Sequence, residues 1–124
     1  MAIIERKVRL LGSRGEYEGL ALFDSGASVS CIRPEIAVQM EQPQRLYVPL
    51  RIATAAEDSY MDVREFVTLQ FCIEGHWFAS QFYLVPGLSE EVIIGAATMQ
   101  QWRFKLDFEK EEVIIDPRVT RMRI

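Results

Sequence analysis

The feature that most constrains the fold is an alternation of apolar and polar residues with a period of two. Leu46, Val48, Leu50 and Ile52 follow this pattern, and it returns between Met61 and Ile73 after a turn near Ala55 to Asp58. A period of two places every second side chain on one face of a strand. The sequence therefore predicts an all-β chain in which these two stretches form a long hairpin.

Turn residues divide the rest of the chain into short segments. We predict further strands over residues 3–11, 17–24, 29–32, 76–85, 92–94, 104–108 and 112–116. Pro34 favours the first position of a helical turn over residues 34–40. A length of 124 residues with 49% hydrophobic residues suits one domain spanning residues 1–124.

One acidic residue stands where an apolar strand is expected to end. Ala21-Leu22-Phe23 leads directly into Asp24-Ser25-Gly26. A strand that ends this way can hold a carboxylate rigidly, and the glycine lets another molecule approach the backbone. Asp24 is therefore a candidate catalytic acid, and the alternative is a turn residue that caps local amides.

A second element lies about seventy residues later. Val92-Ile93-Ile94 is a β-branched stretch that ends at Gly95, and a helical segment to Trp102 and the stretch Phe104 to Phe108 follow. Together with Asp-Ser-Gly, this order resembles the retropepsin-like aspartic proteases over residues 3 to 116. The resemblance implies a single lobe with one short C-terminal helix, closed as a homodimer. It also implies that the hairpin near Ile52 to Tyr60 is the flap that covers bound substrate.

The resemblance implies an aspartic endopeptidase that uses no metal and no cofactor. Such enzymes need two carboxyls about 3 Å apart that share a proton. Because the chain has one suitable motif, a two-fold homodimer would supply Asp24 from each subunit. An extended polypeptide substrate would lie under the flap. The implied residues are Asp24 for catalysis, Ser25 and Gly26 for its support, and Leu22, Ala27, Ser28, Ile52, Ala53, Thr54, Ala55 and Ile94 for substrate binding.

Three positions differ from the retroviral members of this family. Those members commonly have an ion pair where this chain has Ser28 and Ala96, and glycines where the flap tip here reads Ala55-Ala56-Glu57-Asp58. Both partners of the pair are missing together, so no buried charge is left alone. The differences favour an alternative function, a catalytically silent peptide-binding or dimerisation module that keeps the fold.

Two other sites are conceivable from the residue types alone. Cys31, Cys72 and His76 could be ligands of a zinc ion, although they are fewer than a closed site needs. Ser28 and His76 could join an aspartate in a triad, but no Gly-x-Ser-x-Gly sequence surrounds any serine.

Charge and hydropathy exclude several classes of partner. The net charge of -4 is opposite to that of nucleic-acid binders, and we interpret the basic cluster Arg118, Arg121 and Arg123 as a solvated tail. No stretch approaches the roughly 20 apolar residues of a membrane helix, and the first residues do not resemble a secretory signal. Two cysteines are too few for a disulfide framework. We therefore expect a cytoplasmic protein that binds neither nucleic acid nor membranes.

Overall fold

The computed structural model describes residues 3–53 and 59–121, most of which lie in strands. The elements are β1 (Ile3–Leu11), β2 (Glu16–Asp24), β3 (Cys31–Ile32), α1 (Pro34–Ala37), β4 (Gln44–Ala53), β5 (Tyr60–Ile73), β6 (His76–Leu84), β7 (Val92–Ile94), α2 (Ala96–Gln101), β8 (Lys105–Asp107), β9 (Glu112–Ile114) and the 3-10 helix η1 (Pro117–Thr120). The predicted mainly β fold and the short helix after Gly95 are confirmed. Within the described ranges no helix is long and apolar enough to cross a membrane.

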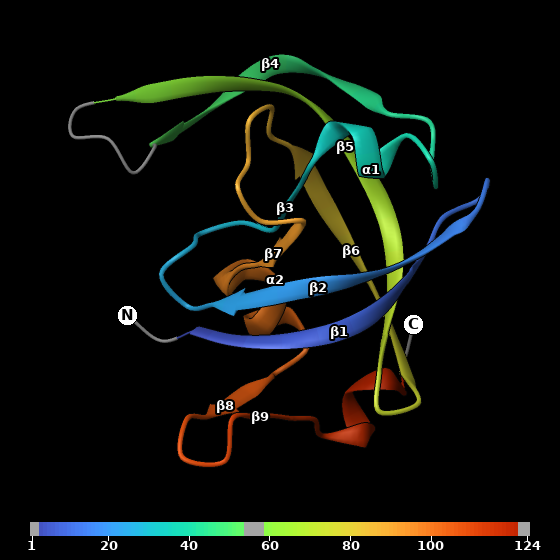
Figure 1. The fold of residues 1–124 in the computed structure, drawn as a ribbon, viewed down its shortest axis with the longest axis vertical. Coiled ribbons are helices and arrows are strands. Elements are labelled where there is room, and N and C mark those ends of the chain that lie inside the picture. The colour runs from blue at the N-terminus through green and yellow to red at the C-terminus, as the bar shows by residue number, and fades with distance from the viewer. Residues whose placement is uncertain (1–2, 54–58, 122–124) are drawn as a thin grey trace.

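Seven strands form one sheet that closes into a barrel. Its order is β1-β2-β7-β3-β6-β5-β4, and β1 also pairs with β5. In that closing contact Leu10 lies opposite Phe71. Strand β4 stays outside the closed part, at the edge beside β5 (Figure 1).

Strand β5 belongs both to the barrel and to a projecting hairpin. Residues 66–73 pair with β6, and residues 60–66 pair with β4, so the β4–β5 hairpin continues past the barrel. Figure 1 shows the end of β4 and the start of β5 on the same side of the molecule as the loop that follows β2. This is the hairpin that the family resemblance implies to be the flap, and its predicted turn, residues 55–58, lies outside the described residues.

Aromatic side chains fill the barrel and hold α2 against it. Phe104 packs edge-on against Phe78 with ring centroids 4.8 Å apart, and it also contacts Phe23 and Phe71. The indole nitrogen of Trp102 donates a hydrogen bond to the carbonyl oxygen of Ala79, 3.0 Å away. The end of α2 is thereby anchored to β6.

Arg118 and Arg121 are exposed, as predicted for a solvated tail, and Arg123 lies outside the described residues. The chain before them nevertheless has a local structure that was not predicted. The Asp116 carboxylate accepts a hydrogen bond from the backbone N–H of Arg118 and forms an ion pair of 2.8 Å with its guanidinium. These contacts begin η1, which contacts β6. Charge patterning alone could not show this, because the ordering residue, Asp116, was predicted to end a strand. The strands predicted over residues 3–11 and 92–94 have the predicted bounds. Other predicted segments are shorter: β3 keeps only Cys31–Ile32, and α1 ends at Ala37.

Candidate functional site

Alternation along β2 places Asp24 on the side of the sheet away from the core. Ala21 and Phe23 are fully buried, whereas Leu22 and Asp24 are half-buried. Successive side chains of a strand point to opposite faces, so Leu22 and Asp24 share one face. The strand ends at Asp24, so its carboxylate lies at the end of β2 and is partly accessible to solvent.

The turn after β2 holds one oxygen of this carboxylate. Oδ1 of Asp24 accepts a hydrogen bond of 2.8 Å from the N–H of Gly26, and the Asp24 carbonyl oxygen accepts one of 3.1 Å from Ala27. No residue in the described parts of the chain donates to Oδ2. One carboxylate oxygen is therefore oriented, and the other can meet a second carboxyl or a water molecule. Ser25 lies beside it with its side chain exposed.

The loop that carries Asp24 is docked onto the start of α2. The N–H of Ala96 donates to the carbonyl oxygen of Ala27 over 2.7 Å, and the N–H of Ala97 donates to that of Ser28 over 3.1 Å. A Cβ at Gly95 would lie only 2.4 Å from the carbonyl oxygen of Val29. The absence of a side chain at Gly95 thus permits the contact. Main-chain hydrogen bonds, without a charged pair, join the segments around Ser28 and Ala96.

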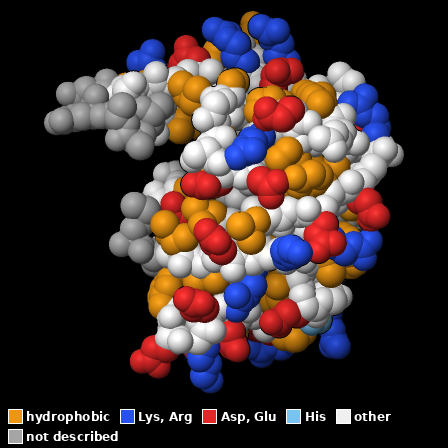
Figure 2. Space-filling view, viewed as in Figure 1, with side chains coloured by type: hydrophobic (Ala, Val, Ile, Leu, Met, Phe, Trp, Pro, Cys, Tyr) orange, Lys and Arg blue, Asp and Glu red, His pale blue; other side chains and the backbone are white. Residues whose placement is uncertain are grey.

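A second apolar cluster connects the projecting hairpin to the strands beside Asp24. Its hairpin members are Ile52, Met61 and Val63, and its other members include Val29 and Ile93. In Figure 2 the surface is hollowed below the hairpin. Of the residues predicted for substrate binding, Ile52 therefore lies in this cluster, Ala53 is exposed on the same hairpin, and Thr54 and Ala55 lie outside the described residues.

Ile94 is not at the surface where a substrate residue was predicted. It is fully buried in the main core and lies opposite Phe23 in the parallel pairing of β2 with β7. Its neighbour Ile93 lies opposite Leu22 and is half-buried. Because adjacent strand residues face opposite sides, Ile93 rather than Ile94 lies on the face that Leu22 occupies.

The loop between β6 and β7 contributes residues near Leu22 that were not predicted from the sequence. Arg33 binds this loop, because its Nε donates to the carbonyl oxygens of Leu88 and Glu90, each 3.0 Å away. The Glu91 carboxylate accepts hydrogen bonds from the hydroxyl of Tyr17 and from the N–H of Leu20. These bonds, with the nearby guanidinium, hold the pKa of Glu91 below its ordinary value. A cavity of about 230 Å³ lies here, lined in part by Leu22. The residues that form these hydrogen bonds are more than fifty positions apart in the sequence, so no local sequence pattern could predict the contacts.

The proposed zinc ligands lie apart. Cys31 is opposite Tyr83 on β6, whereas Cys72 is opposite Trp77, six residues away on the same strand. At about 3.3 Å per residue this separates the two cysteines by roughly 20 Å along the strand. Within residues 3–53 and 59–121, no three His, Cys, Asp or Glu side chains are grouped to hold a metal ion.

The alternative triad has no support from hydrogen bonding. None of the hydrogen bonds among the described residues involves the side chain of Ser28 or that of His76. A serine nucleophile needs its base within hydrogen-bond reach.

Comparisons with known proteins show the family and the fold. Residues 15–121 match the family model for retroviral aspartyl protease. The crystal structure of the retroviral protease-like domain of Ddi1 from Leishmania major is similar, with a TM-score of 0.63 and 16% identity, over 94% of this chain and 90% of that one. The solution structure of the simian foamy virus (mac) protease has a TM-score of 0.50 and 15% identity, over 84% of this chain and 98% of that one. At these identities the two structures show a shared fold. No curated protein sequence matches the chain.

Proposed function

The chain belongs to the retroviral aspartyl protease family, and from this premise we propose that it is an aspartic endopeptidase with Asp24 as its catalytic residue. The observation that supports this most is the state of the Asp24 carboxylate. It ends a rigid strand, its Oδ1 is held by the N–H of Gly26, and no described residue donates to its Oδ2. A carboxyl held in this way is ready to take part in proton transfer.

We propose that the active enzyme is a homodimer. Each chain carries one Asp-Ser-Gly sequence, and a two-fold axis beside Asp24 would bring two carboxyls together. The exposed Ser25 would then face its copy across the axis and, as the family resemblance implies, hold the carboxyls coplanar. The two Asp24 residues would titrate as a coupled pair that shares one proton.

Each step of the proposed hydrolysis keeps protons and bonds in balance. The ionised Asp24 takes a proton from a water molecule as the water oxygen bonds to the peptide carbonyl carbon. The protonated Asp24 of the other subunit gives its proton to the carbonyl oxygen. The tetrahedral intermediate then collapses: one of its hydroxyls returns a proton to the ionised Asp24 of the other subunit as the C=O bond re-forms, the C–N bond breaks, and the leaving nitrogen takes from the first Asp24 the proton that came from water. The pair returns to its starting charge.

An extended polypeptide would occupy the hollow between the β4–β5 hairpin and the loop after Asp24. Leu22, Ile52 and Ile93 would contact its side chains, and Ala53 would contact its backbone. The carbonyl oxygens of Ala27 and Ser28 each accept one hydrogen bond from α2. Each carbonyl oxygen keeps a second lone pair, which could accept a hydrogen bond from the substrate backbone.

The alternative is a catalytically silent module that binds peptides or dimerises through the same surfaces. The observation in its favour is that uncharged Ser28 and Ala96 stand where the retroviral members have an ion pair. Such a module would bind peptides without cleaving them.

Peptide cleavage by matched variants separates these functions. The wild-type protein, Asp24→Asn and the control Asp107→Asn would be incubated with a diverse peptide pool from acidic to neutral pH, and new termini would be read by mass spectrometry. Asp107 lies in the β8–β9 hairpin, where its carboxylate accepts hydrogen bonds from the turn. We expect cleavage by the wild type and by Asp107→Asn only. Equal cleavage by Asp24→Asn, or no cleavage by a folded wild-type dimer, would contradict the proposal.

A further inference from the structure

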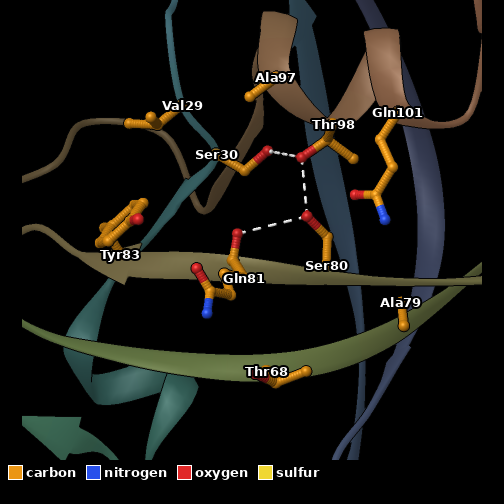
Figure 3. A pocket seen from close by; sticks show the side chains of 10 residues that line it. All are labelled: Val29, Ser30, Thr68, Ala79, Ser80, Gln81, Tyr83, Ala97, Thr98 and Gln101. Atoms are coloured by element: carbon orange, nitrogen blue, oxygen red, sulfur yellow. Dashed lines mark hydrogen bonds between the residues drawn. The ribbon is translucent and has the colours of Figure 1, made fainter.

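A second cavity lies where α2 meets strand β6. Its volume is about 450 Å³, and it lies between β6, α2 and the segment that leads into β3. Figure 3 shows three hydroxyl side chains pointing toward one another in it, those of Ser30, Ser80 and Thr98. None of the residues that line the cavity is charged.

The three hydroxyls form a continuous chain of hydrogen bonds. The N–H of Gly95 donates to Oγ of Ser30 over 3.0 Å. Oγ of Ser30 lies 2.6 Å from Oγ1 of Thr98, which lies 2.8 Å from Oγ of Ser80. Ser80 can donate in turn to the carbonyl oxygen of Gln81, 3.4 Å away (Figure 3).

The carbonyl end fixes the direction of this chain. Because the carbonyl oxygen of Gln81 can only accept, Ser80 spends its one proton there and must accept from Thr98. Thr98 then accepts from Ser30, which accepts from the N–H of Gly95, so each hydroxyl accepts one hydrogen bond and donates one. Hydrogen bonds aligned in this way reinforce one another in a protein interior.

Two members of the chain are deeply buried. Ser30 is 2% exposed and Thr98 is 3% exposed, and they are the buried polar residues of the described chain. Buried hydroxyls are costly unless they are hydrogen-bonded. Losing the Thr98 hydroxyl would take one hydrogen bond from Ser30 and one from Ser80, and it would remove the side-chain link between the segments that they hold.

These segments determine where the Asp24 loop lies. Ser30 ends the loop that begins at Asp24, Gly95 begins the turn on which that loop is docked, and Ser80 fixes both to β6. The hydrogen bonds from Ala96 and Ala97 to the loop depend on the same placement of α2. A displacement of about 1 Å at a reacting group can lower a rate about a hundredfold.

We propose that Ser30, Thr98 and Ser80 are positioning residues whose hydroxyl chain holds the Asp24 loop in the geometry that the two-carboxyl site needs. The inference rests on the proposed function, because it assigns these residues a role in that reaction. They touch neither the substrate nor the reacting atoms.

Thr98→Val tests the proposal because it removes the central hydroxyl with little change in shape. Thr98→Ser keeps the hydroxyl, and Thr68→Val is the matched control. Thr68 lines the same cavity, but its hydroxyl is outside the chain of hydrogen bonds. Should Thr98→Val fail to fold, Ser80→Ala shortens the chain at its half-buried end and replaces it in the test.

The expected result is a loss of turnover without a loss of binding. For Thr98→Val we expect kcat to fall by about tenfold or more with KM nearly unchanged, and the pH profile of kcat to shift as the carboxyl pair changes spacing. Thr98→Ser, which keeps the hydroxyl, should have a kcat close to that of the wild type, and so should Thr68→Val. An unchanged kcat and pH profile for Thr98→Val, or no rescue by Thr98→Ser, would overturn the proposal.

Amide hydrogen exchange distinguishes this inference from the proposed function. If the wild-type protein cleaves no peptide, the proposed function fails, and with it the assigned role in catalysis. Exchange over residues 25–30 still decides whether the hydroxyl chain holds the loop. Faster exchange in Thr98→Val, but not in Thr98→Ser or Thr68→Val, would support the positioning. Equal exchange in all variants would overturn it.

Discussion

Gly95→Ala should damage the site through a steric clash with the Asp24 loop. A Cβ at this position would lie 2.4 Å from the carbonyl oxygen of Val29 and 2.8 Å from that of Ala27. Both contacts are under the 3.0 Å that real Cβ atoms keep, and both involve backbone that cannot rotate away. The loop after Asp24 must therefore separate from α2.

The cost of this change can be estimated from the local geometry. Gly95 has φ of -97° and ψ of -178°, which alanine adopts freely, so the penalty is steric. Overpacking of this kind typically costs about 1 to 3 kcal/mol. Because backbone must move, we expect the upper part of that range, about 2 to 3 kcal/mol. For a domain of this size that lowers Tm by about 8 to 12 °C.

Gly75→Ala is the matched control for this prediction. Gly75 has φ of +81° and nothing within 4 Å of an added Cβ, so alanine there meets backbone strain but no clash. We expect a loss of about 1 kcal/mol, or about 4 °C in Tm, with normal cleavage. Thermal unfolding and peptide cleavage below both Tm values would be compared. A Gly95→Ala variant as stable and as active as Gly75→Ala would refute the argument.

Three further predictions follow from the charged and buried groups. Because the folded protein lowers the pKa of Glu91, the ionised carboxylate stabilises the fold at a pH above its ordinary pKa of 4.5, and this stability is lost as the pH falls through the lower folded pKa. The urea midpoint of Glu91→Gln should therefore fall less between pH 6 and pH 3 than that of the wild type. Parallel plots of urea midpoint against pH for the two proteins would contradict this. Arg118→Ala should raise the pKa of Asp116 from about 2 toward 3.8 in a carboxyl NMR titration, and an unchanged value would show that the guanidinium is not the cause. Burial raises the pKa of Cys31 to about 11, so iodoacetamide should modify Cys72 before Cys31, as followed by mass spectrometry. Modification of Cys31 first would contradict the buried position of its thiol.

Local sequence patterns predicted the elements that depend on neighbouring residues. Alternation between Met61 and Ile73 predicted one long strand of the hairpin, and the strand β5 spans Tyr60–Ile73. The apolar run before Asp24 predicted that this residue ends a strand, as it does in β2. These features follow from side-chain period and turn residues, which a single sequence displays directly.

Features that depend on strand register or distant partners could not be predicted. The choice between Ile93 and Ile94 depends on which of them pairs with Leu22, and a shift of one residue reverses the faces. Ser30 and Thr98 are 68 positions apart in sequence, and nothing near either residue marks the other as its partner.

Subunit mixing tests most directly whether two Asp24 residues form one site. Wild-type protein would be incubated with a threefold excess of Asp24→Asn until subunits exchange, and cleavage would be compared with that of the same amount of wild type alone. If each site needs Asp24 from both chains and subunits pair at random, cleavage should fall to about one quarter. Unchanged cleavage in a mixture shown by mass spectrometry to contain mixed dimers would contradict the shared site.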